Sequence, residues 1–261
     1  MIRGLYTAAT GLDAGMKRMD VISDNLANVG TAGFKREQVL FQSLLDREIY
    51  RYSDQPPVYL GQLGAGVNFR MGTPDFSAGL PRATNNPLDI AFMDAETDKP
   101  EQLTFLAVES AQNGRAYTRN GELMVDGENY LRTLSGAYVL GQSPTGVIQR
   151  IHITNADELT IATDGTLRDA NGFQLARLHM VNPSPNAQLR RMGDSLWAIE
   201  GEVQAAANPN VAQGYLEQAN VQAVREMVDL IAAMRNYETQ AKLIQIQDET
   251  LNKAVNEVGR L

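Results

Sequence analysis

The sequence predicts an α+β protein with a mainly β core, in which an antiparallel β-domain is flanked by N- and C-terminal coiled-coil-type helices that pack together. Three observations support this prediction. Apolar residues recur with a heptad period near both ends of the chain, the C-terminal run contains no glycine or proline, and turn-forming dipeptides are dense between the two runs. Heptads are typical of helices that pair lengthwise, and short runs between Asn-Gly or Asp-Gly turns are typical of antiparallel strands.

An N-terminal helix is expected within residues 1–30, because apolar and small residues there step alternately by three and four. This spacing places their side chains on one narrow stripe of a helix. The stripe comprises Leu5, Ala8, Leu12, Gly15, Met19, Ile22, Leu26 and Val29. Asp13 and Lys17 form an i,i+4 pair on another face, and Gly30 is suited to end the helix.

A longer C-terminal helix is expected within residues 218–261, where a heptad stripe runs through positions 221–258 and pairs with the N-terminal helix. At 1.5 Å per residue it is roughly 55 Å long. Its stripe comprises Met227, Leu230, Met234, Tyr237, Ala241, Ile244, Asp248, Leu251, Val255 and Val258. Asp248 either sets the register of the pair or faces solvent where the helices diverge, and we favour the second reading.

Residues 62–217 are expected to form the antiparallel β-domain. Its turn dipeptides are Asn113-Gly114, Asn120-Gly121, Asp126-Gly127, Asp164-Gly165 and Asn171-Gly172, and its β-type runs are 116–118, 122–125, 138–140, 147–153, 159–162 and 173–181. Asn-Gly and Asp-Gly supply the positive φ angles of tight hairpins. Residues 31–61 are predicted to be a connector, with one or two helical turns around Phe41 to Leu45.

Composition excludes several classes of function. The 261 residues carry a formal net charge of −8, which disfavours nucleic acid and anionic membranes as partners. The chain has no cysteine, so disulfides, thiolate catalysis and cysteine-ligated metals are excluded. Its N-terminus does not read as a cleaved signal peptide, and every apolar run is shorter than the roughly 20 residues that span a bilayer. We therefore expect no direct membrane insertion.

The sequence offers no catalytic, cofactor-binding or metal-binding constellation. His152 and His179 are isolated in β-type runs, without carboxylates at ligand spacing, and are expected to be structural or surface residues. The Asp164-Gly165 segment lacks the spacing and closing glutamate of a calcium loop and is expected to be a hairpin turn. We expect a structural protein that is not an enzyme and carries no cofactor.

The apolar surface of the C-terminal helix is wider than one partner helix can cover. Additional apolar residues outside its seam are Val221, Val224, Val228, Ile231 and Ile246. A monomer would therefore expose an apolar patch, which usually marks an interface. The alternative is an intramolecular helical hairpin packed on the β-domain.

Several motifs resemble those of the bacterial flagellar basal-body rod and hook axial proteins. Residues 25–35 read Asn-Leu-Ala-Asn-Val-Gly-Thr-Ala-Gly-Phe-Lys and resemble the family signature Asn-x-Ala-Asn followed by Thr-x-Gly-(Phe/Tyr)-Lys. The resemblance spans nearly the whole chain, and its other segments are 4–11, 86–91, 116–121, 213–217, 220–221 and 227–231. The length favours the distal-rod type. Where the family usually has a Gly-rich turn, this chain has an acidic insertion over residues 92–104, with Asp94, Glu96, Asp98 and Glu101.

The resemblance implies a structural subunit of the flagellar basal body. Such a subunit is exported unfolded by the flagellar type III export apparatus, without signal cleavage, to the periplasm or cell wall. It polymerises helically with copies of itself and with other rod and hook axial proteins, and it transmits torque. The terminal helices build the inner tube and the β-domain faces outward. A different class of function, a coiled-coil-tethered binding module that uses the β-domain, is the alternative, and a hydrolase is a distant third.

Two groups of site residues follow. The assembly interface is expected to comprise Leu5, Ala8, Leu12, Met19, Ile22, Leu26, Met227, Leu230, Met234, Tyr237, Ala241, Ile244, Leu251, Val255 and Val258. The family-signature bend is expected to comprise Asn25, Asn28, Thr31, Gly33, Phe34 and Lys35. The two asparagines either end the helix as ordinary polar residues or fix the bend by bonding the backbone with their side-chain amides.

Overall fold

The computed structural model describes residues 2–44, 47–51, 58–64, 66–94, 102–110, 114–154, 159–206 and 209–258. The chain divides into two compact units. A helical unit comprises Met1–Ala27, Glu37–Pro74 and Gln222–Leu261, and a β-unit comprises Asn28–Arg36 and Asp75–Val221. The β-unit thus combines the short segment that follows the first helix with residues 75–221.

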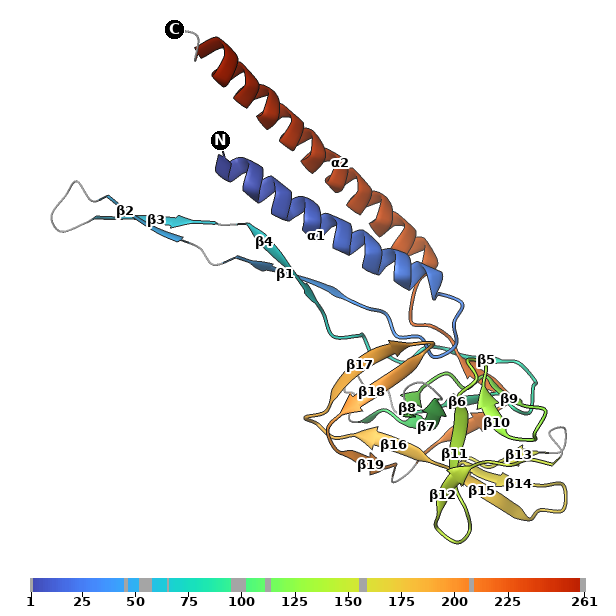
Figure 1. Ribbon diagram of the computed structural model, residues 1–261. Coiled ribbons are helices and arrows are strands. Elements are labelled where there is room, and N and C mark those ends of the chain that lie inside the picture. The colour runs from blue at the N-terminus through green and yellow to red at the C-terminus, as the bar shows by residue number, and fades with distance from the viewer. Residues whose placement is uncertain are drawn as a thin grey trace. The chain divides into compact units, whose positions relative to one another are not determined.

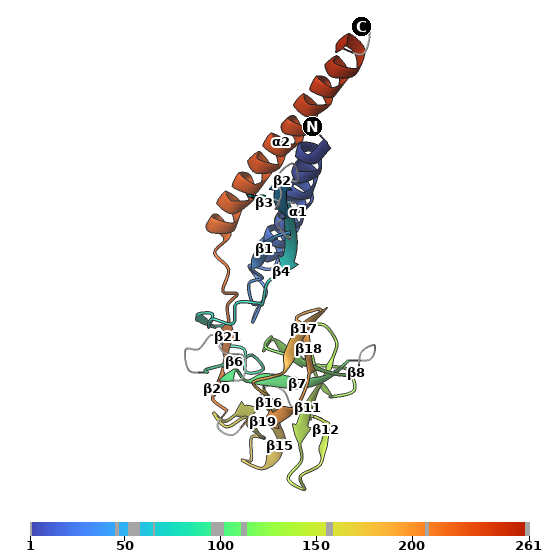
Figure 2. The ribbon, with the colours of Figure 1, turned by 90° about the vertical axis from the view of Figure 1, so that its left-hand side faces the viewer.

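The helical unit contains both terminal helices. Helix α1 spans Ile2–Ala27 and helix α2 spans Ala223–Lys253, followed by a π-helical turn, Ala254–Val258. The two helices lie side by side and contact each other along α1, as both views show (Figures 1 and 2). The helix boundaries agree with the heptad runs to within two or three residues at the ends that the structure describes.

Residues 37–74 of the helical unit contain a two-stranded ribbon, and the predicted helical turn around Phe41 is wrong. Strand β1 (Val39–Ser43) pairs with β4 (Val67–Met71), and β2 (Arg47–Arg51) pairs with β3 (Val58–Leu63). Strands β1 and β4 contact α1. The run Val39-Leu40-Phe41 suits a strand because branched and aromatic side chains pack well on a pleated surface. Pro56-Pro57 and Leu45 lie outside the described residues.

The β-unit contains the remaining strands. They are β5 (Pro81–Ala83), β6 (Ile90–Phe92), β7 (Phe105–Ser110), β8 (Gly114–Thr118), β9 (Leu123–Val125), β10 (Leu131–Thr133), β11 (Tyr138–Gln142), β12 (Ile148–Arg150), β13 (Thr160–Ile161), β14 (Thr166–Arg168), β15 (Gln174–Leu178), β16 (Met180–Pro183), β17 (Gln188–Gly193), β18 (Leu196–Glu200), β19 (Val203–Ala205), β20 (Val211–Gln213) and β21 (Tyr215–Glu217). The main sheet follows the order β13-β14-β15-β11-β7-β8-β18-β17 (Figure 1).

Strand β7 lies in the middle of this sheet and is buried on both faces. Leu106 and Val108 enter one apolar cluster, which also contains Val139, whereas Phe105 and Ala107 enter a second cluster around Trp197. This alternation follows from the two-residue period of a strand. The pairings recorded among the described strands are all antiparallel, so the predicted mainly β, antiparallel core is confirmed.

Some of the predicted turn dipeptides form hairpin turns, whereas another places two backbones close together. Gly165 and Gly172 adopt φ of 78° and 79° in the connections β13–β14 and β14–β15, as a hairpin turn requires. Asn120-Gly121 does not form the predicted hairpin. Instead, a Cβ at Gly121 would lie 1.8 Å from the carbonyl oxygen of Ile90, so glycine here permits close approach of two backbones. Asn113 lies outside the described residues.

Candidate assembly surface and buried charge cluster

The two helices contact each other through a face of α2 that combines apolar residues with two glutamines. Ala233 is buried, Tyr237 and Ile244 are half-buried, and Gln240 and Gln247 lie on the same side. The predicted seam is therefore displaced. Leu230, Tyr237, Ala241, Ile244 and Leu251 lie toward α1, but Met227, Met234, Asp248 and Val255 are exposed. The side chain of Val258 lies outside the described residues.

Two glycines of α1 explain the displacement. A Cβ at Gly4 would lie 2.5 Å from the amide nitrogen of Gln247, and one at Gly11 would lie 3.1 Å from the amide oxygen of Gln240. The glycines are seven residues apart, as are the glutamines, so each glutamine occupies the space that a missing side chain leaves. Both glutamine Oε1 atoms are buried without a hydrogen-bond partner, which costs stability in the helix pair.

The predicted interface residues of α1 are largely covered. Ile22 is 5% exposed, and the other members are half-buried; they are Leu5, Ala8, Leu12, Met19 and Leu26. Helix α1 contacts both α2 and the ribbon. The Oγ1 of Thr10 accepts a hydrogen bond from Val67 N, and the Lys17 ammonium lies 5.6 Å from the centre of the Phe69 ring.

The opposite side of α2 also carries large apolar residues, and these are exposed. Val224, Val228 and Ile231 are 77%, 61% and 53% exposed. They lie roughly half a turn away from Ala233 and Tyr237 at 3.6 residues per turn. We call this row, with the adjacent Met227 and Met234, the apolar row of α2. Consequently α2 leaves the apolar row uncovered within the described chain.

The asparagine that precedes the end of α1 bonds the backbone beyond it. Asn25 is 2% exposed. Its Nδ2 donates to Glu37 O at 3.0 Å, and its Oδ1 accepts from Glu37 N at 2.9 Å. These paired bonds join the last turn of α1 to the start of the ribbon. Asn28 accepts a hydrogen bond from the Thr31 hydroxyl at 3.3 Å and so closes a local turn.

The rest of the signature leads to a cluster of four charged side chains inside the β-unit, Lys35, Asp94, Arg119 and Glu217, which we call the buried charge cluster. Lys35 Nζ lies 2.7 Å from Glu217 Oε1, and Arg119 Nη2 lies 2.8 Å from Glu217 Oε2. Arg119 Nη1 reaches Asp94 Oδ2 at 2.6 Å. The side chains of Lys35 and Arg119 are each 1% exposed. The cluster therefore balances two cations against two carboxylates away from water.

Backbone groups complete the cluster. Lys35 donates to Ser77 O at 2.8 Å, Gly79 N donates to Glu217 Oε1 at 3.0 Å, and Thr104 N donates to Asp94 Oδ2 at 3.0 Å. These bonds matter because a buried charge is tolerated only when its remaining hydrogen-bonding capacity is met.

The cluster shifts the pKa values of Lys35 and Glu217. Burial lowers the pKa of Lys35, and the nearby Arg119 guanidinium lowers it further, against the attraction of Glu217. Burial alone would raise the pKa of Glu217, but the positive charges of Arg119 and Lys35 outweigh burial and hold that pKa below 4.5. Glu217 is thus a carboxylate at neutral pH, as its two ion pairs require.

The backbone around Lys35 is fitted closely to the rest of the β-unit. Gly33 has φ of 67°, and a Cβ there would lie 2.3 Å from Arg119 O. Arg36 N donates to Asn220 Oδ1 at 2.7 Å, and Asn220 Nδ2 donates to Asp75 O at 2.8 Å. The structure thus brings together the signature, the 116–121 motif and the C-terminal motifs.

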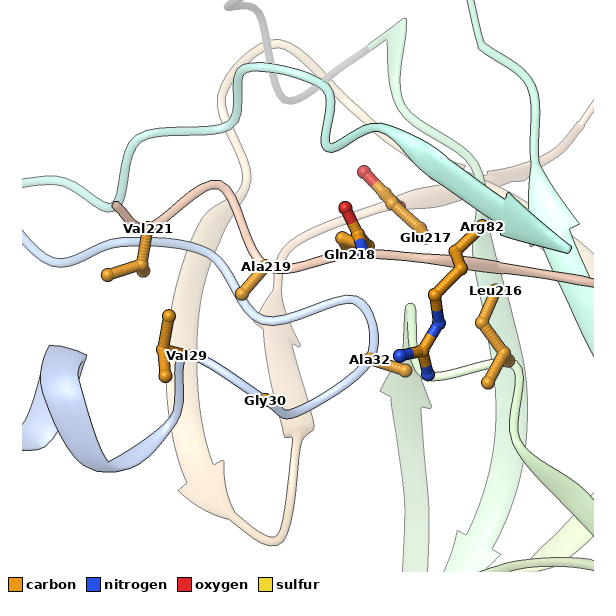
Figure 3. Close-up of a pocket in the computed structure, with 9 residues that line it drawn as sticks. All are labelled: Val29, Gly30, Ala32, Arg82, Leu216, Glu217, Gln218, Ala219 and Val221. Carbon is orange, nitrogen blue, oxygen red and sulfur yellow. The ribbon is translucent and has the colours of Figure 1, made fainter. Parts of the chain in front are cut away.

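A hollow of about 240 Å³ lies beside the cluster. Its lining consists of Val29, Gly30, Ala32, Arg82, Leu216, Glu217, Gln218, Ala219 and Val221 (Figure 3). Arg82 extends toward Ala32 and Leu216, and the rest of the drawn lining is mainly apolar or small (Figure 3). The carboxylate of Glu217 is already engaged by Lys35 and Arg119, so the hollow lacks the convergent polar groups of a typical ligand site.

The histidines have structural contacts. His152 forms an isolated bridge with Tyr130, and the two rings meet edge to face with their centres 5.4 Å apart. Burial lowers the pKa of His179. Within the part of the chain that the structure describes, no group of histidine and carboxylate side chains is placed to hold a metal ion. Nor is any helix there long and apolar enough to cross a membrane.

Three family models match successive parts of the chain. "Flagella basal body rod protein" matches residues 5–35, "Flagellar hook protein FlgE/F/G D1 domain" matches 103–175, and "Flagellar basal body rod FlgEFG protein C-terminal" matches 212–257. The flagellar basal-body rod protein FlgG of Agrobacterium fabrum is 31% identical over 95% of this chain and 96% of its own length. FlgG of Buchnera aphidicola from Acyrthosiphon pisum is 30% identical over 97% and 98%, and FlgF of Escherichia coli is 29% identical over 97% of each chain.

The chain belongs to the flagellar basal-body rod protein family. It is a structural protein of the flagellar basal body and serves motility. The buried charge cluster joins all three matched regions of this rod protein, since Lys35, Arg119 and Glu217 each come from a different one. Asp94 comes from none of them and opens the acidic insertion, whose Glu96, Asp98 and Glu101 lie outside the described residues.

Sequence reasoning missed three members of the cluster. Arg119 and Glu217 stood inside motifs quoted for the resemblance, but a charged residue in a motif does not by itself reveal its partner. Asp94 was grouped with the other acidic residues of the insertion. The sequence does contain one indication of the cluster. Lys35, Arg119, Asp94 and Glu217 are two positive and two negative residues that each lie next to an apolar run, and charges that become buried must be paired with opposite charges.

Proposed function

We propose that this rod protein polymerises helically through its terminal helices and transmits torque along the rod, as a subunit without enzymatic activity. Its neighbours are copies of itself and other axial proteins of the rod and hook, and the distal-rod type is the form we favour. The observation that carries the proposal is the apolar row of α2, in which Val224, Val228 and Ile231 are more than half exposed.

The free energy of burying apolar side chains favours covering the apolar row of α2 by another subunit. Burying an apolar side chain of this size contributes about 1.5–3 kcal/mol. Exposed apolar rows of this kind usually mark protein–protein contacts. The ribbon adds further exposed apolar side chains to the helical unit, and these are Leu40, Phe41, Tyr50, Val58, Tyr59, Leu60 and Val67. A heterologous contact between such surfaces that does not close into a ring generates an open helical filament.

The α1–α2 pair supports an assembly that begins from separable helices. Its contact face includes two glutamines with unpartnered oxygens, and coiled-coil-type packing becomes complete, in this proposal, when neighbours cover both helices. Helices held mainly by contacts between molecules can remain weakly folded during passage through the type III export apparatus. Ordering is then coupled to assembly.

The direct test is polymerisation of the purified protein at increasing concentration, followed by sedimentation and electron microscopy. We expect open filaments above a critical concentration. Leu12→Asp and Ile244→Asp should abolish filaments and leave the circular dichroism and unfolding of the β-unit unchanged. A wild-type protein that stays monomeric at millimolar concentration, alone and with rod and hook axial partners, would refute the proposal.

A further inference from the structure

The segment 211–220 supplies the strand partners of two earlier strands. In the described sheets, β6 pairs with β20 and β5 pairs with β21, and each forms a separate two-stranded sheet. The same segment also binds residues that follow α1, because Gly33 N donates to Glu217 O at 2.8 Å. Residues 31–36, β5 and β6 therefore depend on a segment that lies more than a hundred positions later in the chain.

The buried charge cluster imposes the same dependence through charge. Lys35 and Glu217 are 182 positions apart. Without Glu217, Asp94 would be the only carboxylate of the cluster, and Lys35 and Arg119 would carry an excess positive charge into a buried site. An unpaired buried charge is strongly unfavourable, so this end of the β-unit gains little from closing before Glu217 is in place.

We propose that residues 31–36, β5, β6, β20, β21 and the buried charge cluster form a closure unit, which closes onto the preformed main sheet as the last step of folding of the β-unit. Glu217 is the residue whose entry permits closure. Joining segments so distant in sequence is entropically the most expensive contact to make early. If the chain is exported with its N-terminus first, the closure unit cannot close until residues 211–220 have also been exported. This consequence rests on the proposed export, but the closure unit itself does not.

Hydrogen exchange of the full chain under native conditions tests the order of opening. Amides of β5, β6, β20 and β21 should share one opening free energy that is lower than that of β7, β8 and β18. Val181→Ala, in the apolar cluster around Trp197 that contains no residue of β5, β6, β20 or β21, should accelerate exchange of β7, β8 and β18 by about tenfold and leave the closure unit unchanged. Equal acceleration of both groups by Val181→Ala would overturn the proposal, because it would mean that the β-unit opens only as a whole.

Glu217→Gln provides the complementary test. It should accelerate exchange of the closure unit by at least about a hundredfold, equivalent to ~2.7 kcal/mol. In rapid-mixing experiments it should speed unfolding and leave the refolding rate within about twofold, as expected for a contact that forms last. A refolding rate reduced as much as the equilibrium stability would overturn the proposal.

A charge-balanced control separates charge from packing. Lys35→Met combined with Glu217→Gln removes one charge of each sign and keeps the Arg119–Asp94 pair, so most of the lost protection should return. No recovery would overturn the role given to Glu217. If Glu217→Gln does not fold, Asn220→Ala substitutes for it, since it removes hydrogen bonds to Arg36 and Asp75 without changing a charge. Asn220→Ala should increase the unfolding rate and leave the refolding rate within about twofold of the wild-type value.

Discussion

Substituting Ile231 by aspartate separates assembly from folding most clearly. Ile231 is 53% exposed in the apolar row of α2. Covering the exposed half of an isoleucine contributes about 1 kcal/mol or slightly more, and desolvating a carboxylate at the same contact costs several kcal/mol. Assembly should therefore weaken by at least ~3 kcal/mol, which raises the critical concentration more than about a hundredfold. The free energy of unfolding of the helical unit should fall by only about 1 kcal/mol.

The assay measures the protein that remains soluble after sedimentation, as a function of total concentration, beside thermal unfolding of the same samples. Asn236→Asp is the matched control, because it adds the same charge at an exposed polar position of α2 outside the apolar row. It should leave the critical concentration within about threefold of the wild-type value. Filaments of Ile231→Asp that form at the wild-type concentration would refute the assignment of the apolar row to assembly.

Three further predictions concern the interior of each unit. Gln240→Leu should raise the stability of the α1–α2 pair by about 1 kcal/mol, measured by helix unfolding, because it removes an unpartnered buried oxygen. The pKa of Glu217 is lowered in the folded state, so its contribution to the free energy of unfolding is present above pH 4.5 and is lost as the pH falls through the folded-state pKa. Gly121→Ala should destabilise the β-unit by about 3 kcal/mol or more, because its Cβ would meet Ile90 O at 1.8 Å, whereas Gly127→Ala, with nothing within 4 Å, should be nearly neutral.

Each prediction has an outcome that contradicts it. Gln245→Leu changes an exposed glutamine of α2, and equal stabilisation by Gln245→Leu would show that helix propensity, rather than the buried oxygen, is responsible. An unfolding free energy whose acid dependence is unchanged in Glu217→Gln would exclude that carboxylate as the group responsible. Similar losses of β-unit stability in Gly121→Ala and Gly127→Ala would contradict the close approach of the backbones at Gly121 and Ile90.

The sequence predicted the secondary structure of both ends but only part of the middle, because the predicted β-type runs coincide with β8, β9, β11, β12, β13, β15 and β16 and leave β7 and β17 to β21 unassigned. Two heptad runs gave α1 and α2, because a stripe of period near 3.5 has no alternative explanation over 25 residues or more. The run 173–181 gave β15 and β16. The ribbon was not predicted, since a two-stranded element with exposed apolar residues on an extended arm lacks the regular inside–outside alternation that identifies a strand. The contacts of the ribbon with α1 join residues that are distant in the chain, such as Thr10 and Val67, which are 57 positions apart.

The site was predictable only in part, because the resemblance located motifs but not their contacts. Asn25 and Lys35 were both assigned to one bend, yet they serve different units. Asn25 bonds the start of the ribbon, whereas Lys35 ends in the buried charge cluster of the β-unit. Which residues a long charged side chain reaches depends on the fold, and pairs such as Lys35 and Glu217 leave no local pattern in the sequence.

The orientation of α2 shows why an apolar stripe does not by itself identify its partner. Apolar spacing alone would turn Met227 and Met234 toward α1, but α1 presents Gly4 and Gly11 on its contact face. Glycines let a neighbouring helix bring longer polar side chains close, and Gln240 and Gln247 fit that space. The contact stripe therefore shifts by one residue along the heptad and leaves the apolar row free. The apolar row of α2 is thereby left exposed, and this is the surface that our proposal assigns to a neighbouring subunit.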